Sequence, residues 1–406
     1  MSEMRNAYPE NSNKIISKLW LLMLAMAFSN FMARGSYLLL AVGALFFVVH
    51  YFRIKIPVSS VPLLLFACIY FAFTFHSKGP VDAVQIFVCP LLWLVGYNLP
   101  EARQKDTIFV VMAVLSLGMA AHGWLNYAYN VVQKTDMYGS VKLDIWTGEG
   151  QAATGQAAHF SFFLACLYWM LFAQKKRRLR LLIAVGFFAA LMYAVRLGSR
   201  TFLVLSAMVF AVGIGASMLQ RGQKRRAVYL LLGLLTALIV FVIAYSRDLW
   251  GVRTFVEGSY FFRRTEREGG FFDLSTSERW KFKRIYLENL LTIPWGGGHL
   301  MKLAGGYAHD LWLDMFDEAG ILALMAILWY TVAAGLRILA VRRRGGLTVQ
   351  ERNALLCYGI VIYAQFFAEP IWEGSPMLFY AFVLADGMFA KYLFILSESR
   401  YPAGRA

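Results

Sequence analysis

The chain has 406 residues, of which 59% are hydrophobic and only 16% are charged. Soluble domains carry about 25% charged residues, so this composition excludes an ordinary soluble protein. A formal net charge of +16 would suit a nucleic-acid partner, but much of it lies in short loops between apolar segments. We therefore predict contact with membrane lipids and no nucleic acid as a partner.

The N-terminal stretch MSEMRNAYPENSNKIISKLW has no small-residue cleavage site behind a short apolar core. We expect it to lead into a first helix that stays in the protein, not to act as a removed signal peptide. The cysteines lie inside apolar runs, which predicts buried packing and neither a disulfide framework nor a metal site. They are Cys68, Cys89, Cys166 and Cys357.

Apolar segments suited to cross a hydrocarbon core of about 30 Å recur along the chain. Twelve are identified, at residues 17–33, 37–52, 58–75, 83–97, 108–128, 157–173, 181–195, 201–219, 227–245, 310–338, 354–367 and 376–396. The predicted fold is therefore an all-α polytopic membrane protein with about twelve transmembrane helices.

The densest basic clusters are QKKRRLR at 174–180, QRGQKRR at 220–226 and VRRRGG at 341–346. The positive-inside rule assigns such clusters to the cytoplasm. With twelve spans they fall on one side together with both termini, which predicts a multi-pass membrane protein with cytoplasmic termini. In a bacterial inner membrane the other side is the periplasm. The opposite, periplasmic side then receives residues 129–156, 196–200, 246–309 and 368–374.

One outer segment is long enough to form a small domain. It divides the chain into residues 1–245 with nine predicted transmembrane helices, the periplasmic loop domain 246–309, and residues 310–406 with three more. Within this loop, STSERWKFKRIYLENLLTI is typical of an amphipathic helix, capped by Ser275 or Ser277 and followed by Pro294. The glycines of WGGGH then predict a turn.

Arg196 and Arg200 flank the tight turn in VRLGSRTFLVL. A guanidinium at the end of a span often extends along the helix toward the membrane surface, and this explanation competes with a functional one for Arg196. Arg200 lies between a Gly-Ser turn and an apolar run. A guanidinium there suits a diphosphate, because its planar donors pair with two oxygens at once.

The segment GGYAHDLWLDMFDEAG, residues 305–320, places a histidine and four carboxylates at the start of an apolar run. If a helix starts near His309, then Asp310, Asp314 and Asp317 fall on one face. The positive helix end explains Asp310, whereas an ionisable group deeper in a span usually faces a wet cavity. A neutral His309 at the mouth of that cavity is suited to act as a general base. His299 in GGGHL is its rival for this role.

Three stretches resemble, in the same order, motifs of the O-antigen ligase and polymerase superfamily, bacterial C-type glycosyltransferases that use undecaprenyl-diphosphate glycans. They are LGSRTFLVL, STSERWKFKRIYLENLLTIPWGGG and YAHDLWLDMFDEAGI. The earlier loop DIWTGEGQAATGQAAHF is similar to the family's polar loop before its middle helices. The resemblance covers about residues 200–324, and elsewhere it extends only to helical character and span count.

The resemblance implies roles for individual residues. His309 takes the place of the family histidine that activates the acceptor hydroxyl, and Arg200 and Arg279 take those of the arginines that hold the lipid diphosphate. The family commonly has Asn where this chain has an aspartate after the histidine, so a contact from that amide is missing. Four residues are expected to support the site: Arg196, Asp310, Asp314 and Trp280.

The chemistry that these roles imply is an inverting displacement without a cofactor. Undecaprenyl diphosphate is a good leaving group whose charge arginines can stabilise, and the acceptor hydroxyl needs a base. No His/Cys/Asp spacing resembles a zinc site and no phosphate-binding glycine loop is present, so neither a metal nor a nucleotide is expected.

Three functions fit these features. The leading one is ligation of an O-antigen to the lipid A core, favoured by the compact size and the single large outer loop. The second is a polymerase that extends a lipid-linked glycan, favoured by Asp310 and the form YAHDLWLDMFDEAGI. The third is a transporter or flippase that uses Asp314, Asp317 and Glu318 as a proton or cation path.

Overall fold

The computed structural model describes residues 10–50, 54–79, 83–133, 141–174, 176–219, 224–260, 262 and 278–400. The elements before the middle of the chain are α1 (Glu10–Phe28), η2 (Phe31–Ala33), α2 (Gly35–Val49), η3 (Val58–Ser60), α3 (Val61–Lys78), η4 (Gln85–Phe87), α5 (Val88–Asn98), η5 (Pro100–Arg103), α6 (Lys105–Val132), β1 (Val141–Leu143), β2 (Gly150–Ala152), α7 (Ala153–Ala158), α8 (Ser161–Tyr168), η6 (Trp169–Ala173) and α9 (Arg177–Leu197).

After α9, every regular element among the described residues is a helix. These are α10 (Arg200–Leu219), α11 (Lys224–Ser246), η7 (Leu249–Gly251), α12 (Val252–Glu257), α14 (Glu278–Glu288), α15 (His299–Ala304), α16 (Leu311–Arg344), α17 (Val349–Ala368), α18 (Ile371–Gly374) and α19 (Pro376–Arg400). The predicted caps Ser275 and Ser277 lie outside the described residues.

Six helices are long and apolar enough to cross a membrane, namely Val58–Lys78, Lys105–Val132, Gly155–Ala173, Arg177–Leu197, Leu311–Arg344 and Pro376–Ser399. Within the described residues, each of the twelve predicted apolar segments contains helical structure, several of them in shorter helices. The chain is therefore an all-α membrane protein, and twelve crossings stay a prediction.

The centre of the bundle is the close packing of α5 against α19. A Cβ added to Gly96 would stand 2.2 Å from the carbonyl oxygen of Leu384, and one on Gly387 would stand 2.2 Å from that of Trp93. Such small residues let two helices approach backbone to backbone, as is common inside membranes. These two glycines therefore fix how α5 and α19 cross.

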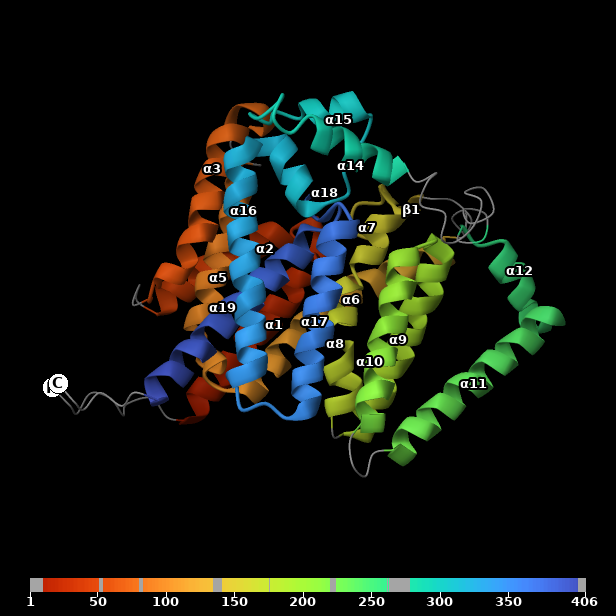
Figure 1. Ribbon diagram of the computed structural model, residues 1–406. Helices are drawn as coiled ribbons and strands as arrows, with labels where there is room; N and C mark the ends of the chain where they lie inside the picture. Colours follow the sequence, from red (N-terminus) through yellow and green to blue (C-terminus); the bar gives the residue numbers. More distant parts are fainter. Residues whose placement is uncertain are drawn as a thin grey trace.

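The two ends of the bundle differ in charge and in structure (Figure 1). The N-terminal ends of α9 and α11 and the C-terminal end of α16, which adjoin the basic clusters, lie at the lower end. At the upper end α14 and α15 lie above the first turns of α16, and α18 lies below them beside the same helix. The structure thus separates the basic loops from the segment that carries the predicted site.

The predicted segment 310–338 is not one continuous helix, because α16 breaks at Gly320. This residue has φ 80° and ψ −175°, a conformation that only glycine adopts without strain. The amide of Gly297 donates to the freed carbonyl of Glu318 at 3.1 Å, and the amide of Ile321 donates to the carbonyl of Pro294 at 2.8 Å. The predicted WGGGH turn therefore fills the break and satisfies its backbone groups.

Candidate functional site

The site is built around the first turn of α16. Asp310 caps this helix, because its side chain accepts hydrogen bonds from the amides of Trp312 at 3.1 Å and Leu313 at 3.3 Å. Asp314, one turn further on, accepts from the amides of Ala308 at 3.0 Å and Asp310 at 3.2 Å. Both carboxylates are buried. They fix the loop that precedes the helix as well as the helix itself.

A buried lysine on α14 approaches this helix start from the side. Lys283 donates to Asp310 at 3.2 Å and to the carbonyl oxygen of Phe367, and its ammonium lies 3.6 Å from the centre of the Phe367 ring. Burial lowers the pKa of Lys283 below its ordinary value, although Asp310 opposes this effect. Trp280, one turn earlier, is half exposed and packs edge-on against Phe367.

Arg279 lies beside this lysine and ties α14 to the end of α17. Its guanidinium donates to the carbonyl oxygen of Ala368 at 2.6 Å and to Glu369 at 3.1 Å. Two of its five N–H donors are thus used, and 22% of the side chain stays exposed. Together with the buried lysine it places two cations on the α14–α17 side of the site, each paired with one carboxylate.

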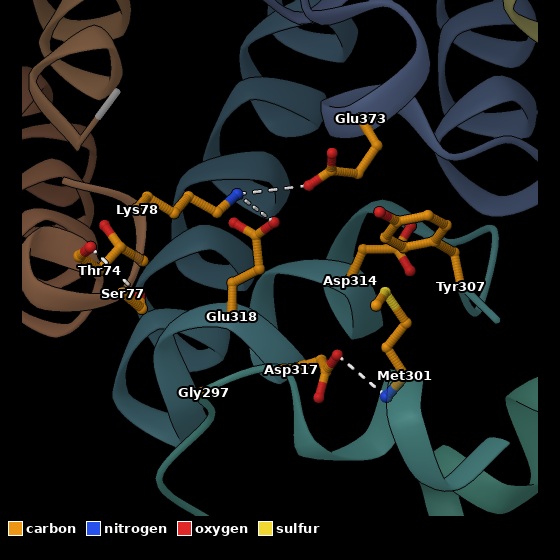
Figure 2. A pocket seen from close by; sticks show the side chains of 11 residues that line it. Thr74, Ser77, Lys78, Gly297, Met301, Tyr307, Asp314, Asp317, Glu318 and Glu373 are labelled. Carbon is orange, nitrogen blue, oxygen red and sulfur yellow. Dashed lines mark hydrogen bonds and ion pairs between the residues drawn. The ribbon is translucent and has the colours of Figure 1, made fainter. Parts of the chain in front are cut away.

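The opposite side of the helix start is an acidic cavity of about 270 Å³ (Figure 2). Lys78 lies between two carboxylates, 2.5 Å from Glu318 and 3.3 Å from Glu373. A hydrogen bond with the Glu318 carboxyl lowers the pKa of Glu373, and Lys78 acts in the same direction. The remaining lining is made by Thr74, Ser77, Gly297, Gly298, Met301, Tyr307, Asp314 and Asp317.

Two further groups hold the acidic side in place. Tyr70 donates a hydrogen bond to Glu318, and the indole N–H of Trp372 donates to the Tyr70 hydroxyl at 2.8 Å. Asp317 accepts from the amides of Leu300 at 2.7 Å and Met301 at 3.1 Å, and so caps α15. Asp317 therefore has a structural role in addition to its place in the lining of the cavity.

His309 lies where these two sides meet. Its φ of 54° is a left-handed conformation that is rare outside glycine, and the neighbouring contacts impose it. On one side Ala308 is held by Asp314, which lines the acidic cavity, and on the other Asp310 is held by Lys283. The rival His299 starts α15 and is exposed. The backbone of His309 is therefore the better fixed of the two.

The remaining predicted arginines lie on a neighbouring pair of helices. Arg200 starts α10 and is half-buried, and α10 packs along α17, whose last carbonyls Arg279 contacts. Arg196, in the last turn of α9, lies with its guanidinium 5.2 Å from the centre of the Phe255 ring. The structure thus brings Arg279, Trp280, Asp310 and Asp314 to one place and positions Arg196 and Arg200 on the adjacent α9–α10 turn.

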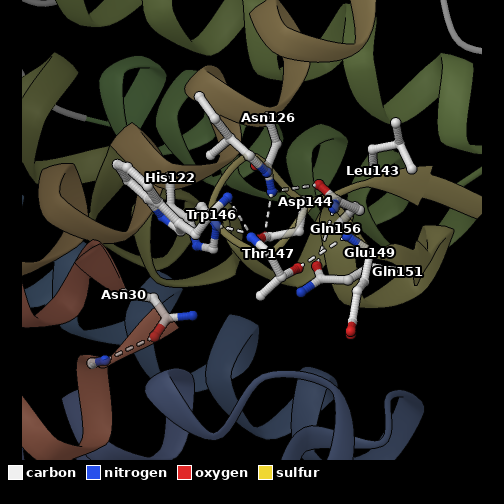
Figure 3. A network of polar contacts seen from close by, with 12 residues as sticks. Asn30, His122, Asn126, Leu143, Asp144, Trp146, Thr147, Glu149, Gln151 and Gln156 are labelled. Atoms are coloured by element: carbon white, nitrogen blue, oxygen red, sulfur yellow. Dashed lines mark hydrogen bonds and ion pairs between the residues drawn. The ribbon is translucent and has the colours of Figure 1, made fainter. Parts of the chain in front are cut away.

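A second polar network lies under the β1–β2 hairpin (Figure 3). His122 contacts Asp144 at 2.7 Å, and the side-chain amide of Asn126 donates to Asp144 at 3.2 Å and to Gln156 at 2.9 Å. The imidazole of His159 lies 4.1 Å from that of His122, centre to centre. All these groups are buried.

Sequence reasoning missed several of these residues. Lys78 lies in a segment without a motif, and Lys283 lies within STSERWKFKRIYLENLLTIPWGGG, where no role is predicted for it. No role is predicted for His122 or His159 either. One signal was available in the sequence: Lys283 is the position of α14 one turn from Arg279 and Trp280, so all three share one helix face. No such signal links Lys78 to Glu318, which are 240 residues apart.

Comparison with known proteins adds no family to this description. No protein-family model matches the chain, and no curated protein matches it.

Proposed function

We propose that this chain is a membrane glycosyltransferase that moves a glycan from undecaprenyl diphosphate to an acceptor hydroxyl. The favoured acceptor is the lipid A core oligosaccharide, which makes the reaction O-antigen ligation in lipopolysaccharide assembly. The observation that carries the proposal is the fixed backbone of His309 between the Lys283–Asp310 pair and the carboxylates of the cavity.

The division of charge assigns the two substrates to two sides. A diphosphate is repelled by carboxylates and attracted by guanidinium groups, so the donor binds on the side of Arg279 and Arg200. Arg279 retains donors beyond those it gives to Ala368 and Glu369. The acidic cavity suits the acceptor, because carboxylates accept hydrogen bonds from sugar hydroxyls.

The reaction is then a direct displacement. His309 takes the proton from the acceptor hydroxyl, whose oxygen attacks the anomeric carbon and forms the new glycosidic bond. The bond from that carbon to the diphosphate oxygen breaks, and undecaprenyl diphosphate leaves with its charge stabilised by Arg200 and Arg279. The configuration at the anomeric carbon is inverted. No metal ion takes part, since cationic side chains stabilise the leaving group.

The proposed setting is the inner membrane of a bacterium, crossed twelve times, with the site in the periplasm. The separation of the basic loops from the α14–α15 end supports this orientation. Both termini are then cytoplasmic. Nucleotide sugars are absent from the periplasm, which agrees with a lipid-linked donor.

The test is complementation in a strain that lacks its own ligase, with lipopolysaccharide separated on a gel. Wild type is expected to cap the core. His309→Ala should lower capping at least about 100-fold, the usual contribution of a general base, while His299→Ala serves as the matched control and keeps activity. Arg200→Ala is expected to weaken donor use. Membrane insertion of every variant is checked by immunoblot.

The other outcomes identify the competing functions. A bare core together with a longer lipid-linked glycan, lost in His309→Ala, would assign the chain as a polymerase. A transporter predicts that Asp314→Asn abolishes function while His309→Ala is tolerated, and the Lys78–Glu318–Glu373 group inside a cavity is the feature that favours it. Full activity of His309→Ala in both assays would refute the glycosyltransferase proposal.

A further inference from the structure

The network under the β1–β2 hairpin holds a constellation that the proposed reaction does not use. His122 lies in α6, Asp144 follows β1 and His159 follows α7. One candidate ligand atom from each lies within 4.8 Å of the other two. Their exposed fractions are 0%, 1% and 7%. The fold therefore brings two imidazoles and a carboxylate together in one buried cluster.

This place has buried polar atoms without a hydrogen bond. Among the described residues, neither Nε2 of His159 nor Nδ1 of His122 has a partner. A buried polar atom that is left unpaired destabilises the fold, so such atoms in a native protein call for a ligand, a water or an ion. The neighbouring carboxylate favours a cation.

We propose that His122, Asp144 and His159 bind a zinc ion that fastens the β1–β2 hairpin to α6 and to the end of α7. Zinc binds imidazole nitrogen and carboxylate oxygen at about 2.0–2.2 Å, and two histidines with one carboxylate are an established zinc donor set. Three protein ligands leave one position of a tetrahedron for water. The inference is independent of the proposed reaction, in which this ion takes no part.

The contact between His122 Nε2 and Asp144 Oδ2, at 2.7 Å, is a hydrogen bond in the metal-free protein. Zinc takes the place of the shared proton, which leaves to solvent as the ion binds. Two ligands of one zinc ion lie roughly 3 Å apart, so the pair separates only slightly. His159 approaches from the adjacent ring, 4.1 Å away between centres.

The surroundings hold the carboxylate ligand in place. The other oxygen of Asp144 accepts from the amides of Trp146 at 2.9 Å and Thr147 at 3.2 Å, and Asn126 donates to Oδ2 at 3.2 Å (Figure 3). Hydrogen bonds of this kind orient the ligands of metal sites. The place is sealed from solvent, and the carboxylate ligand is already oriented before an ion binds.

The role of the ion follows from what the hairpin contacts. β2 leads directly into α7, and α7 packs against α18, the helix that carries Glu373 of the acidic cavity. A Cβ added to Gly155 of α7 would stand 3.4 Å from the carbonyl oxygen of Gly374. By fixing the hairpin, zinc would therefore stabilise the wall of the cavity.

The test uses the full-length protein, purified in detergent, treated with a chelator and then titrated with Zn²⁺ alone. Wild type is expected to bind one ion per chain and to unfold at a higher temperature once zinc is added. His159→Gln should bind at least about tenfold more weakly, since even loss of an orienting group costs that much. This variant removes a ring nitrogen without a partner, so folding should persist.

The matched control is His76→Gln, which changes an exposed histidine near the end of α3 and should bind zinc like wild type. Co²⁺ is titrated into wild type as a second measurement, and the absorption of a cobalt ion with nitrogen and oxygen ligands is expected. No rise in unfolding temperature with Zn²⁺, or equal zinc affinity in His159→Gln and wild type, would overturn the proposal. Both results are independent of glycan transfer.

Discussion

The start of α16 and the hairpin network use the same residue types in opposite ways. At the start of α16, carboxylates and cations form ion pairs that join α3, α14, α16 and α17, and a cavity opens beside them. Under the hairpin, a carboxylate is surrounded by amides and imidazoles and is closed off from solvent. The first arrangement can receive a substrate, whereas the second can only hold structure or an ion. The two regions therefore differ in their access to solvent and not in the types of residue that they contain.

The largest effect is expected where a buried charge loses its partner. Lys283→Met leaves Asp310 buried without its cation and should lower the free energy of unfolding by about 4 kcal/mol. Thermal unfolding in detergent, followed by tryptophan fluorescence, measures this change. Lys281→Met, on the exposed face of the same helix, is the control. A Lys283→Met/Asp310→Asn double variant should recover part of the loss, and equal effects of Lys283→Met and Lys281→Met would contradict the pairing.

The hairpin network should respond less strongly to loss of Asn126, because this side chain is neutral and its removal leaves no buried charge without a counter-ion. Asn126→Ala removes bonds to Asp144, Gln156 and the amide of Ile145, and the expected cost is about 3 kcal/mol. Hydrogen exchange should show the hairpin opening before the bundle. Asn353→Ala, which loses one long hydrogen bond of 3.4 Å, should change little. A uniform loss of protection across the bundle would argue against a separate hairpin unit.

A smaller effect is expected at the break in α16. Gly320→Ala places a Cβ at φ 80° and 2.7 Å from the carbonyl oxygen of Pro294, and the strain should cost about 2 kcal/mol. Gly215→Ala, in open space within α10, should be neutral or stabilising, since alanine favours helices. If Gly320→Ala unfolds at the wild-type temperature, the break in α16 does not depend on glycine at this position, which contradicts the described packing of the WGGGH turn against α16.

The smallest expected effect is a dependence of folding stability on pH that is caused by Lys283. Its lowered pKa means that the folded protein binds fewer protons than the unfolded chain between that pKa and the usual lysine value. The stability that Lys283 contributes is therefore lowest below this window and rises with pH through it. As pH rises toward the usual lysine pKa of about 10.4, the stability of wild type relative to Lys283→Met should increase. A decrease across this range would mean that the ammonium form is favoured by folding.

Much of the candidate site could be predicted from one local segment. The sequence places Asp310 at the positive start of a helix, with further carboxylates one and two turns on. In the structure Asp310 is the N-cap of α16. A helix in STSERWKFKRIYLENLLTI was predicted, and α14 (Glu278–Glu288) lies within this stretch. The break at Gly320 was not predicted, because an apolar run with one glycine is indistinguishable from a continuous helix until another segment occupies the gap.

The sequence by itself determined the membrane class, the positions of the apolar helices and the residues around His309, because composition and helical periodicity are local properties. Only the tertiary structure decided that Lys283 pairs with Asp310, that Lys78 meets Glu318 across 240 residues, and that His122 meets Asp144 and His159. Such pairs depend on which helices pack together. That choice rests on close contacts such as those of Gly96 and Gly387 between α5 and α19, to which no short motif in the chain corresponds.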